Sequence, residues 1–250
     1  MTRHFKAIFW ILRATNININ FTILLSLCFI FGCSTNSKTS QVIYYTTYDE
    51  SIMYPSKCDF NADIISNTYT NGKGVIKFDG DVTTIGENAF ANCTRLTSVN
   101  IPDSVTTIGE FAFASCESLT EFTGKFATED DRSLIVDNTI IAYANASGPT
   151  YTIPDSVTTI GAMAFYSCTR LTSVTIPDSI TEIGVMAFDS CNSLTSVYCK
   201  ATTPPALGGT GVFYANGSGR KIYVPADAVG TYKRATNWRE DAYAIVGYDF

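Results

Sequence analysis

The sequence predicts a mainly β solenoid in which coils of 23 residues stack along one axis. First, residues 153–175 (IPDSVTTIGAMAFYSCTRLTSVT) are followed directly by a near copy at 176–198 (IPDSITEIGVMAFDSCNSLTSVY). Second, the same pattern occurs at 101–123 and, in weaker form, at 78–100. Third, 46% hydrophobic residues in a chain of 250 suffice for a sizeable core. The solenoid is therefore expected to span residues 78–200.

Each coil is expected to hold two short extended runs. In residues 171–176 (LTSVTI) the spacing L-x-x-L-x-L turns Leu171, Val174 and Ile176 inward and leaves Ser173 and Thr175 facing outward. The second run covers residues 180–183 and ends at Gly184, because glycine tolerates positive φ.

Residues 187–191 (AFDSC) are expected to form one helical turn that places Phe188 and Cys191 in the core. Because one coil cannot bury its own apolar face, stacked coils supply the core between them. Equivalent residues then form an aromatic and an aliphatic ladder. These comprise Phe90, Phe113, Phe165 and Phe188, and Leu96, Leu119, Leu171 and Leu194.

The N-terminus indicates export. Basic residues precede an apolar run at 21–31, which is shorter than the roughly 20 residues that a membrane-spanning helix needs. Residues 30–33 (IFGC) resemble a bacterial lipobox, which implies a lipoprotein signal peptide at 1–33 and lipidation of Cys33. The alternatives are a single membrane anchor, an ordinary signal peptide with a chance cysteine, or internal initiation without export. Residues 34–41 (STNSKTSQ) are then a polar tether.

Residues 42–77 lack the repeat and are expected to form an N-terminal cap, because the first coil would otherwise expose apolar side chains and open strand edges. Strands are predicted at 42–48 and 75–78, with a turn at 66–74. The tyrosines of this cap are expected to pack within it, and an aromatic binding surface is the alternative. They are Tyr44, Tyr45, Tyr48, Tyr54 and Tyr69.

Residues 124–152 interrupt the array and predict a variant coil that carries a hairpin. Its strands are expected at 134–136 and 140–143, on either side of a turn at Asp137 and Asn138. The acidic cluster at 129–131 (EDD) lacks the regular ligand spacing of an EF-hand, so a solvated turn is expected there.

Beyond Lys200 the composition shifts, and residues 201–250 are expected to form a C-terminal cap. A strand is predicted at 221–225, a short helix at 226–238 and a closing strand at 244–248. Tyr232 and Trp238 are expected to pack inside this cap. A carbohydrate-binding platform is the alternative for these two residues.

Four of the eight cysteines occupy one position of the repeat and are expected to be reduced, buried thiols that form a ladder. They are Cys93, Cys116, Cys168 and Cys191. Export would permit disulfides, but a small apolar side chain is all that this position requires. The chain contains no C-x-x-C, so a zinc cluster is not expected.

Charge and composition argue against nucleic-acid binding and catalysis. The chain has 17 basic and 23 acidic residues, and three basic residues lie in the expected signal, so the remainder is more acidic than the formal net charge of −6. An acidic surface repels phosphate backbones. The only histidine, His4, also lies in the signal, and the chain lacks a Walker A sequence. No enzyme activity, metal or cofactor is expected.

The repeat units at 153–175 and 176–198 resemble the BspA-type leucine-rich repeats of bacterial surface proteins, which are common among Bacteroidetes. The resemblance covers residues 78–200, and its period, proline, glycine, Ala-Phe and cysteine recur together. It implies a curved leucine-rich-repeat solenoid that runs unbroken through the variant unit. It also implies a cell-surface location and, as in characterised members, adhesion to host proteins or to other bacteria.

The outward strand positions are therefore the candidate binding residues for a host or bacterial protein or a glycan. They are Ser98, Asn100, Glu121, Thr123, Ser173, Thr175, Ser196 and Tyr198. Most are small and polar, which favours a broad surface over a deep pocket, and Tyr198 alone is of the hot-spot type. The chain is thus expected to be a non-catalytic surface protein or adhesin, anchored by lipid to the outer membrane. The alternative is a structural or antigenic envelope lipoprotein, or a non-catalytic subunit of a surface complex.

Overall fold

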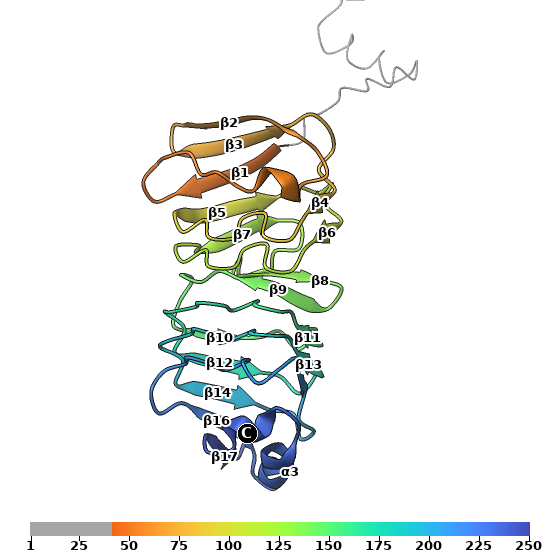
Figure 1. Ribbon diagram of the computed structural model, residues 1–250, viewed down its shortest axis with the longest axis vertical. Coiled ribbons are helices and arrows are strands. Elements are labelled where there is room, and N and C mark those ends of the chain that lie inside the picture. The colour runs from red at the N-terminus through yellow and green to blue at the C-terminus, as the bar shows by residue number, and fades with distance from the viewer. Residues whose placement is uncertain (1–41) are drawn as a thin grey trace, which may run out of the picture. The chain divides into compact units, whose positions relative to one another are not determined.

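Residues 42–250 are described by the computed structural model, and they form a β solenoid (Figure 1). This confirms the fold class that the repeats predict. The predicted signal peptide at 1–33, its Cys33 and the tether at 34–41 lie outside the described residues. Within the described part of the chain, no helix has the length and apolar character needed to cross a membrane.

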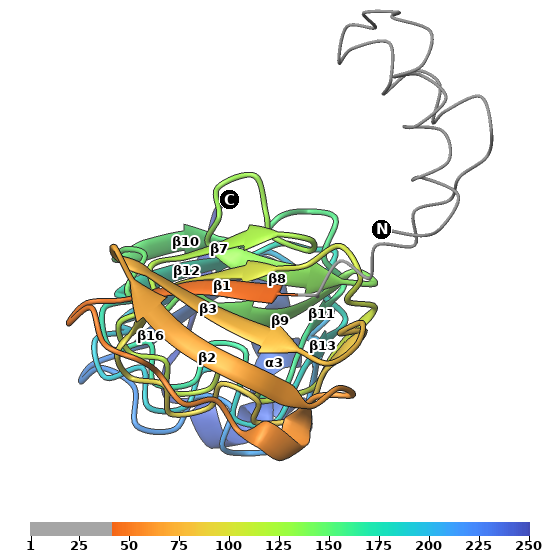
Figure 2. The ribbon, with the colours of Figure 1, turned by 90° about the horizontal axis from the view of Figure 1, so that it is seen from above.

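The longer strands form two five-stranded sheets, which stack along the solenoid (Figures 1 and 2). The first sheet, in the order β2-β3-β1-β5-β7, contains β1 (Val42–Thr47), β2 (Ile64–Thr70), β3 (Lys73–Phe78), β5 (Leu96–Ile101) and β7 (Glu121–Gly124). The second, in the order β10-β12-β14-β16-β17, contains β10 (Thr150–Thr152), β12 (Ser173–Ile176), β14 (Ser196–Cys199), β16 (Lys221–Pro225) and β17 (Ile245–Tyr248).

The second run of each coil contributes to two further sheets. One pairs β4 (Thr84–Ile85) with β6 (Thr107–Ile108). The other, in the order β15-β13-β11-β9-β8, contains β8 (Ser133–Val136), β9 (Thr139–Tyr143), β11 (Thr159–Ile160), β13 (Glu182–Ile183) and β15 (Ala206–Leu207).

Equivalent residues of successive coils pair in parallel register. Val174 on β12 pairs with Val197 on β14, and Thr175 pairs with Tyr198. Val174 and Val197 are fully buried, whereas Thr175 and Tyr198 are half-buried on the outer face. The predicted inside and outside of the first strand are therefore confirmed.

The helical turn predicted at residues 187–191 is wrong, because this segment is a series of turns. Met186 and Ser190 have left-handed φ values of 53° and 60°, which no α-helix contains. The backbone N–H of Phe188 donates to the carbonyl of Val212 in the next coil at 3.0 Å. Backbone hydrogen bonds thus join this segment to the next coil, alongside turn bonds within it such as that from the Asp189 N–H to the Met186 carbonyl at 3.1 Å.

Gly184 is required for a different reason from the one predicted. Its φ is not positive, and a Cβ atom added to it would lie 2.5 Å from the backbone nitrogen of Ala162 in the preceding coil. The glycine therefore permits close approach between coils, rather than a left-handed turn.

The predicted aromatic ladder is present as two separate stacks, and the second contains two rings more than predicted. Phe165 and Phe188 stack with ring centroids 4.7 Å apart, and Tyr143 and Phe213 extend this ladder at 4.9 and 5.5 Å. A separate stacked pair is formed by Phe90 and Phe113, 5.1 Å apart. The four predicted leucines are all fully buried.

The variant unit at 124–152 contains the predicted hairpin, β8 and β9, joined through Asp137 and Asn138. Both turn residues have positive φ, 47° and 59°, as a tight two-residue hairpin loop requires. The first long-strand sheet ends at β7 and the second begins at β10, so the ladder of long strands divides here, while β9 of the hairpin pairs in parallel with β11 of the following coil and continues the solenoid. The buried core divides into two clusters on either side of the hairpin.

At the N-terminal end, β1 pairs antiparallel with β5 and with β3, so the segment before the repeats extends the first sheet. The turn predicted at 66–74 is shorter than expected. Residues 66–70 belong to β2, which pairs antiparallel with β3, and the tight turn is confined to Asn71 and Gly72. The three-stranded antiparallel arrangement covers the first coil.

Beyond Lys200 the parallel ladder continues, because β16 pairs with β14 and β17 pairs with β16. The helical segment follows β16 as η2 (Ala226–Ala228) and α3 (Val229–Arg234), with η3 (Trp238–Asp241) after it and η1 (Lys57–Asp59) near the other end. Tyr232 and Trp238 are fully buried and donate to the carbonyls of Ala201 and Pro205 at 2.8 and 2.7 Å. Packing, not a carbohydrate platform, is the role of these two side chains.

The predicted cysteine ladder is buried and free of disulfides among the described residues. The thiol of Cys116 donates to the carbonyl of Phe90 at 3.1 Å, and that of Cys191 to the carbonyl of Phe165 at 3.0 Å. In the next coil the amide of Asn216 makes the equivalent bond to Phe188. The repeat position therefore supplies a buried hydrogen-bond donor as well as apolar volume.

Alkylation of the native protein with iodoacetamide is expected to label Cys58 and to spare the five buried cysteines. The thiolate is the reactive form, and burial raises the pKa of Cys93 and Cys199 to about 11. Burial also raises the pKa of Cys116 and Cys168. Mass spectrometry of tryptic peptides, with and without guanidinium, measures this pattern. Labelling of Cys116 as fast as that of Cys58 in the native state would contradict it.

Candidate functional site

The eight predicted binding residues all lie on the outer side of the long strands, in two separate groups. The first group, on β5 and β7, comprises Ser98, Asn100, Glu121 and Thr123. The second group, on β12 and β14, comprises Ser173, Thr175, Ser196 and Tyr198. Because the sheet divides between β7 and β10, the two groups belong to different sheets.

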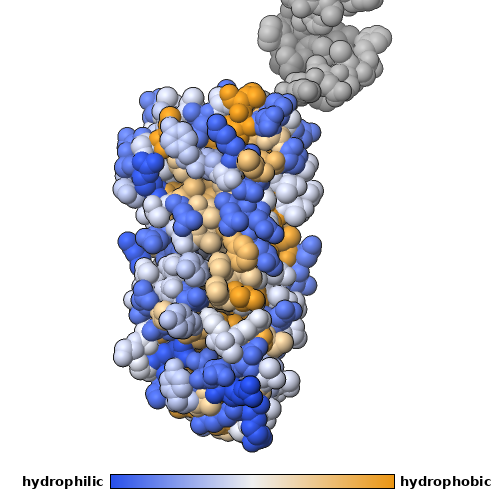
Figure 3. Space-filling view, viewed as in Figure 1, coloured by the Kyte–Doolittle hydropathy of each residue, from blue (hydrophilic) through white to orange (hydrophobic). Residues whose placement is uncertain are grey.

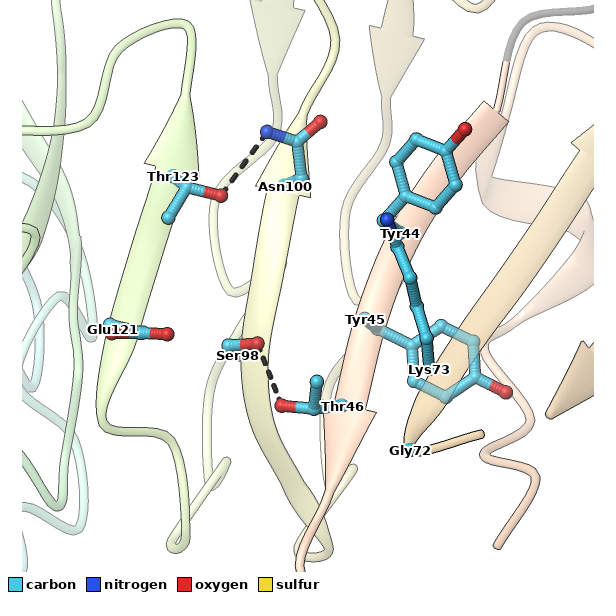
Figure 4. A pocket seen from close by; sticks show the side chains of 9 residues that line it. All are labelled: Tyr44, Tyr45, Thr46, Gly72, Lys73, Ser98, Asn100, Glu121 and Thr123. Carbon is cyan, nitrogen blue, oxygen red and sulfur yellow. Dashed lines mark hydrogen bonds between the residues drawn. The ribbon is translucent and has the colours of Figure 1, made fainter. Parts of the chain in front are cut away.

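The first group lines a hollow of ≈ 370 Å³, here called the N-terminal hollow (Figure 4). Its lining adds residues of the cap, so that it comprises Tyr44, Tyr45, Thr46, Gly72, Lys73, Ser98, Asn100, Glu121 and Thr123. β1 is the reason that these residues meet, because it pairs with β3 on one side and with β5 on the other.

Hydrogen bonds fix the floor of the N-terminal hollow. The hydroxyls of Thr46 and Ser98 lie 2.7 Å apart, and the amide of Asn100 donates to the Thr123 hydroxyl at 3.1 Å (Figure 4). Side chains ordered in this way lose little conformational freedom when a ligand binds.

Tyr44 and Lys73 form the rim of the N-terminal hollow, and neither is among the predicted binding residues. The Lys73 ammonium lies 3.7 Å from the centre of the Tyr44 ring, a cation–π contact (Figure 4). Tyr44 is 36% exposed, whereas its neighbour Tyr45 is buried. The predicted packing of the cap tyrosines therefore holds for Tyr45 and for Tyr69, whose ring lies 5.8 Å from that of Tyr45. It is wrong for Tyr44, which faces outward over the hollow, and for Tyr48 and Tyr54, which are 65% and 75% exposed.

The second group contributes Thr175 and Tyr198 to another hollow of ≈ 530 Å³, here called the C-terminal hollow. Its lining comprises Thr152, Thr175, Tyr198, Lys200, Tyr248, Asp249 and Phe250. Ser173 and Ser196 lie on the same strands but line neither of these two hollows.

A band of apolar surface runs down the upper and middle parts of the face shown in Figure 3, whereas the lower end of this face is mostly hydrophilic. In the turn that follows β13, two apolar side chains are exposed, Val185 by 45% and Met186 by 37%. Phe111 and Met163, which occupy the same turn position as Met186, share its positive φ. No other feature of this face points to a particular ligand.

Residues 42–250 contain no histidine, and within them no three potential metal ligands cluster. In the acidic turn of the variant unit, Asp130 accepts hydrogen bonds from the Thr128 hydroxyl and the Arg132 backbone, so this carboxylate stabilises the turn. Both hollows are open to solvent and are lined by polar and aromatic side chains.

The sequence profile described as "BspA type Leucine rich repeat region" matches this chain in six copies, over residues 63–129 and 140–229. The match begins in the N-terminal cap and extends through the coil after Lys200, so it reaches beyond the predicted repeats at 78–200 at both ends. No curated protein matches the chain.

Several solved structures share similarity with the chain. A leucine-rich cell surface protein from Faecalibacterium prausnitzii is 23% identical, with a TM-score of 0.43, over 61% of this chain and 47% of that one. The pneumococcal vaccine antigen PcpA is 14% identical, with a TM-score of 0.37, over 62% and 57%. A leucine-rich repeat protein from Bacteroides ovatus is 27% identical, with a TM-score of 0.32, over 63% and 45%. The chain thus spans about half the length of these proteins.

Proposed function

Because the chain belongs to the BspA-type leucine-rich repeat family, we propose that it is a non-catalytic binding protein of the bacterial cell surface. It recognises a protein or a glycan of the host or of another bacterium through the outward side chains of its long strands. A lipid on Cys33 anchors it to the outer membrane.

The N-terminal hollow is the observation that carries this proposal. Four of the eight outward residues meet there, hydrogen bonds order its floor, and Tyr44 and Lys73 rise at its rim. An aromatic ring beside a cation, over a preorganised polar floor, is typical of the few side chains that dominate binding energy. The absence of histidine from residues 42–250 favours binding over general acid–base catalysis.

The test is binding of the detergent-solubilised full-length chain to a glycan array and to immobilised matrix proteins. Tyr44→Ala and Lys73→Ala are each expected to weaken the wild-type interaction by about tenfold, the effect of losing one hot-spot side chain. Tyr54→Ala is the matched control, because Tyr54 is 75% exposed and lies outside the hollow. Wild-type protein that binds nothing, or binding that Tyr44→Ala leaves intact, would refute the role of this surface.

Lipidation is tested separately in the native host. Wild-type protein is expected to incorporate labelled fatty acid, and globomycin, which blocks processing of lipoprotein signals, is expected to stop its maturation. Cys33→Ala is expected to abolish the labelling because the variant lacks the acceptor thiol. Labelling that persists in Cys33→Ala would rule out this residue as the anchor.

A further inference from the structure

Four aromatic side chains gather on the outer face at the C-terminal end of the second sheet. This tyrosine cluster consists of Tyr198, Tyr223, Tyr248 and Phe250. Tyr198 on β14 and Tyr223 on β16 pair in register, and their rings stack 4.6 Å apart at an angle of 12°. Tyr248 on β17 meets both rings edge-on at 5.4 and 5.5 Å, and Phe250 lies 5.0 Å from Tyr248.

The tyrosine cluster is not part of the hydrophobic core. The same strands bury Val197, Ile222 and Ile245 on their inner side. The cluster faces the other way, and Tyr248 and Phe250 remain 42% and 52% exposed. The core is therefore complete without these rings, and they add apolar area to the surface.

The preceding coils hold no aromatic residue at this outward position. Thr152 pairs with Thr175, and Thr175 pairs with Tyr198, so three coils place threonine, threonine and tyrosine in one column. Tyr223 continues the column. The stacking of coils requires only a small polar side chain at this position, so the repeat itself does not explain the two tyrosines.

Polar groups surround the exposed rings. The C-terminal hollow is bounded by the hydroxyl-bearing Thr152 and Thr175 and by one side chain of each charge, Lys200 and Asp249. The opposite charges offset each other, so the hollow attracts neither a polyanion nor a polycation.

We propose that the C-terminal hollow binds a neutral glycan, with a pyranose ring stacked against Tyr198 and Tyr248. A pyranose has a face of C–H groups and a perimeter of hydroxyls, which match an aromatic surface and a rim of mixed donors and acceptors. Lys200 donates to sugar hydroxyls and Asp249 accepts from them. This inference rests on the proposed binding function and assigns it a ligand class and a second site.

A protein partner fits this hollow less well. Protein interfaces surround their aromatic anchors with a broad zone of contacts that excludes water. Next to the hollow, the outward positions of β12 and β14 hold the small side chains of Ser173 and Ser196. The aromatic area therefore ends at Tyr198 on this side of the hollow, which suits a sugar ring better than a broad protein interface.

The test uses isothermal titration calorimetry of the full-length chain with three probes: cellohexaose, maltohexaose and chitohexaose. The wild type is expected to bind at least one of them. Tyr198→Ala and Tyr248→Ala are each expected to weaken that binding by about tenfold, because each removes a stacking ring. Tyr248→Phe keeps the ring and is expected to stay within about threefold of the wild type.

Tyr243→Ala is the matched control, since Tyr243 is 78% exposed and lies outside the C-terminal hollow. Thermal unfolding of each variant verifies that the fold persists. The proposal is overturned if the wild type binds none of the three probes, or if Tyr198→Ala and Tyr248→Ala bind as the wild type does. A protein ligand lost in Tyr248→Ala, without any saccharide binding, would assign the hollow to a protein instead. None of these results alters the separate test of Tyr44 and Lys73.

Discussion

Phe165→Ala is expected to lower the free energy of unfolding by about 3–5 kcal/mol. Phe165 is fully buried in the C-terminal part of the core and stacks between Tyr143 at 4.9 Å and Phe188 at 4.7 Å. Alanine removes the buried ring and leaves a cavity that rings in two adjacent coils border. The backbones that carry those rings are held by inter-coil hydrogen bonds, from Tyr143 to Ala164 at 2.9 Å and from Phe188 to Val212 at 3.0 Å, so the cavity cannot collapse easily.

Urea denaturation followed by circular dichroism measures this loss. Tyr214→Ala removes an aromatic ring that is 71% exposed, so it controls for the loss of a ring without burial. It is expected to change stability by about 0.5 kcal/mol or less, as is usual for surface positions. If Phe165→Ala lost no more stability than Tyr214→Ala, the aromatic ladder would not be a principal part of the core.

The first strand of each coil is predictable because two independent constraints agree on it. The period of two assigns an inside and an outside within one coil, and the stacking of near-identical coils repeats that choice. Val174 and Val197 are therefore buried together, and Thr175 and Tyr198 both face outward. If a strand shifted by one residue, its apolar side chains would move to the outer face, and its buried positions would no longer match those of the adjacent coils.

The turns are not predictable in the same way, because contacts between coils determine them. Met186 and Ser190 adopt left-handed φ although neither residue type favours it. The N–H groups of Phe188 and Ser190 bond to the next coil, at Val212 and Tyr214. Local propensity favours a helical turn for this segment, and only the position of the next coil changes that outcome.

The candidate sites were predictable in part for a similar reason. Ser98 and Asn100 follow from the repeat, but Tyr44 and Lys73 reach the same hollow through the antiparallel pairing of β1 with its neighbours. Nothing in the sequence of the cap fixes that register. Tyr223 and Tyr248 lie beyond Lys200, where the sequence no longer shows the repeat pattern, although their strands continue the parallel ladder.

Arg220→Met is expected to lower the free energy of unfolding by about 3–5 kcal/mol at neutral pH. The Arg220 guanidinium is buried, pairs with the Asp241 carboxylate, and donates to the Phe213 carbonyl and the Asn216 side chain. Methionine fills part of the volume but leaves a buried carboxylate without its counter-charge. The exposed Arg239, paired with Glu240 at 3.8 Å, provides the control, because Arg239→Met is expected to cost about 1 kcal/mol or less.

The effect of Arg220→Met is expected to diminish in acid, which separates loss of charge pairing from loss of packing. Burial raises the pKa of Asp241 above its ordinary value of 3.8, and the Arg220 guanidinium opposes this rise. Without Arg220 the pKa of Asp241 in the folded protein rises further, so the folded state binds a proton at a pH where the unfolded chain does not. The stability of Arg220→Met therefore increases as the pH falls through that folded pKa towards 3.8.

Urea midpoints at about pH 7 and about pH 4.5 measure the difference. The double variant Arg220→Met/Asp241→Leu, which removes both charges, is expected to regain stability at neutral pH. A loss that stayed equal at both pH values and in the double variant would show that packing of the arginine stem, and not its charge, stabilises this end of the solenoid.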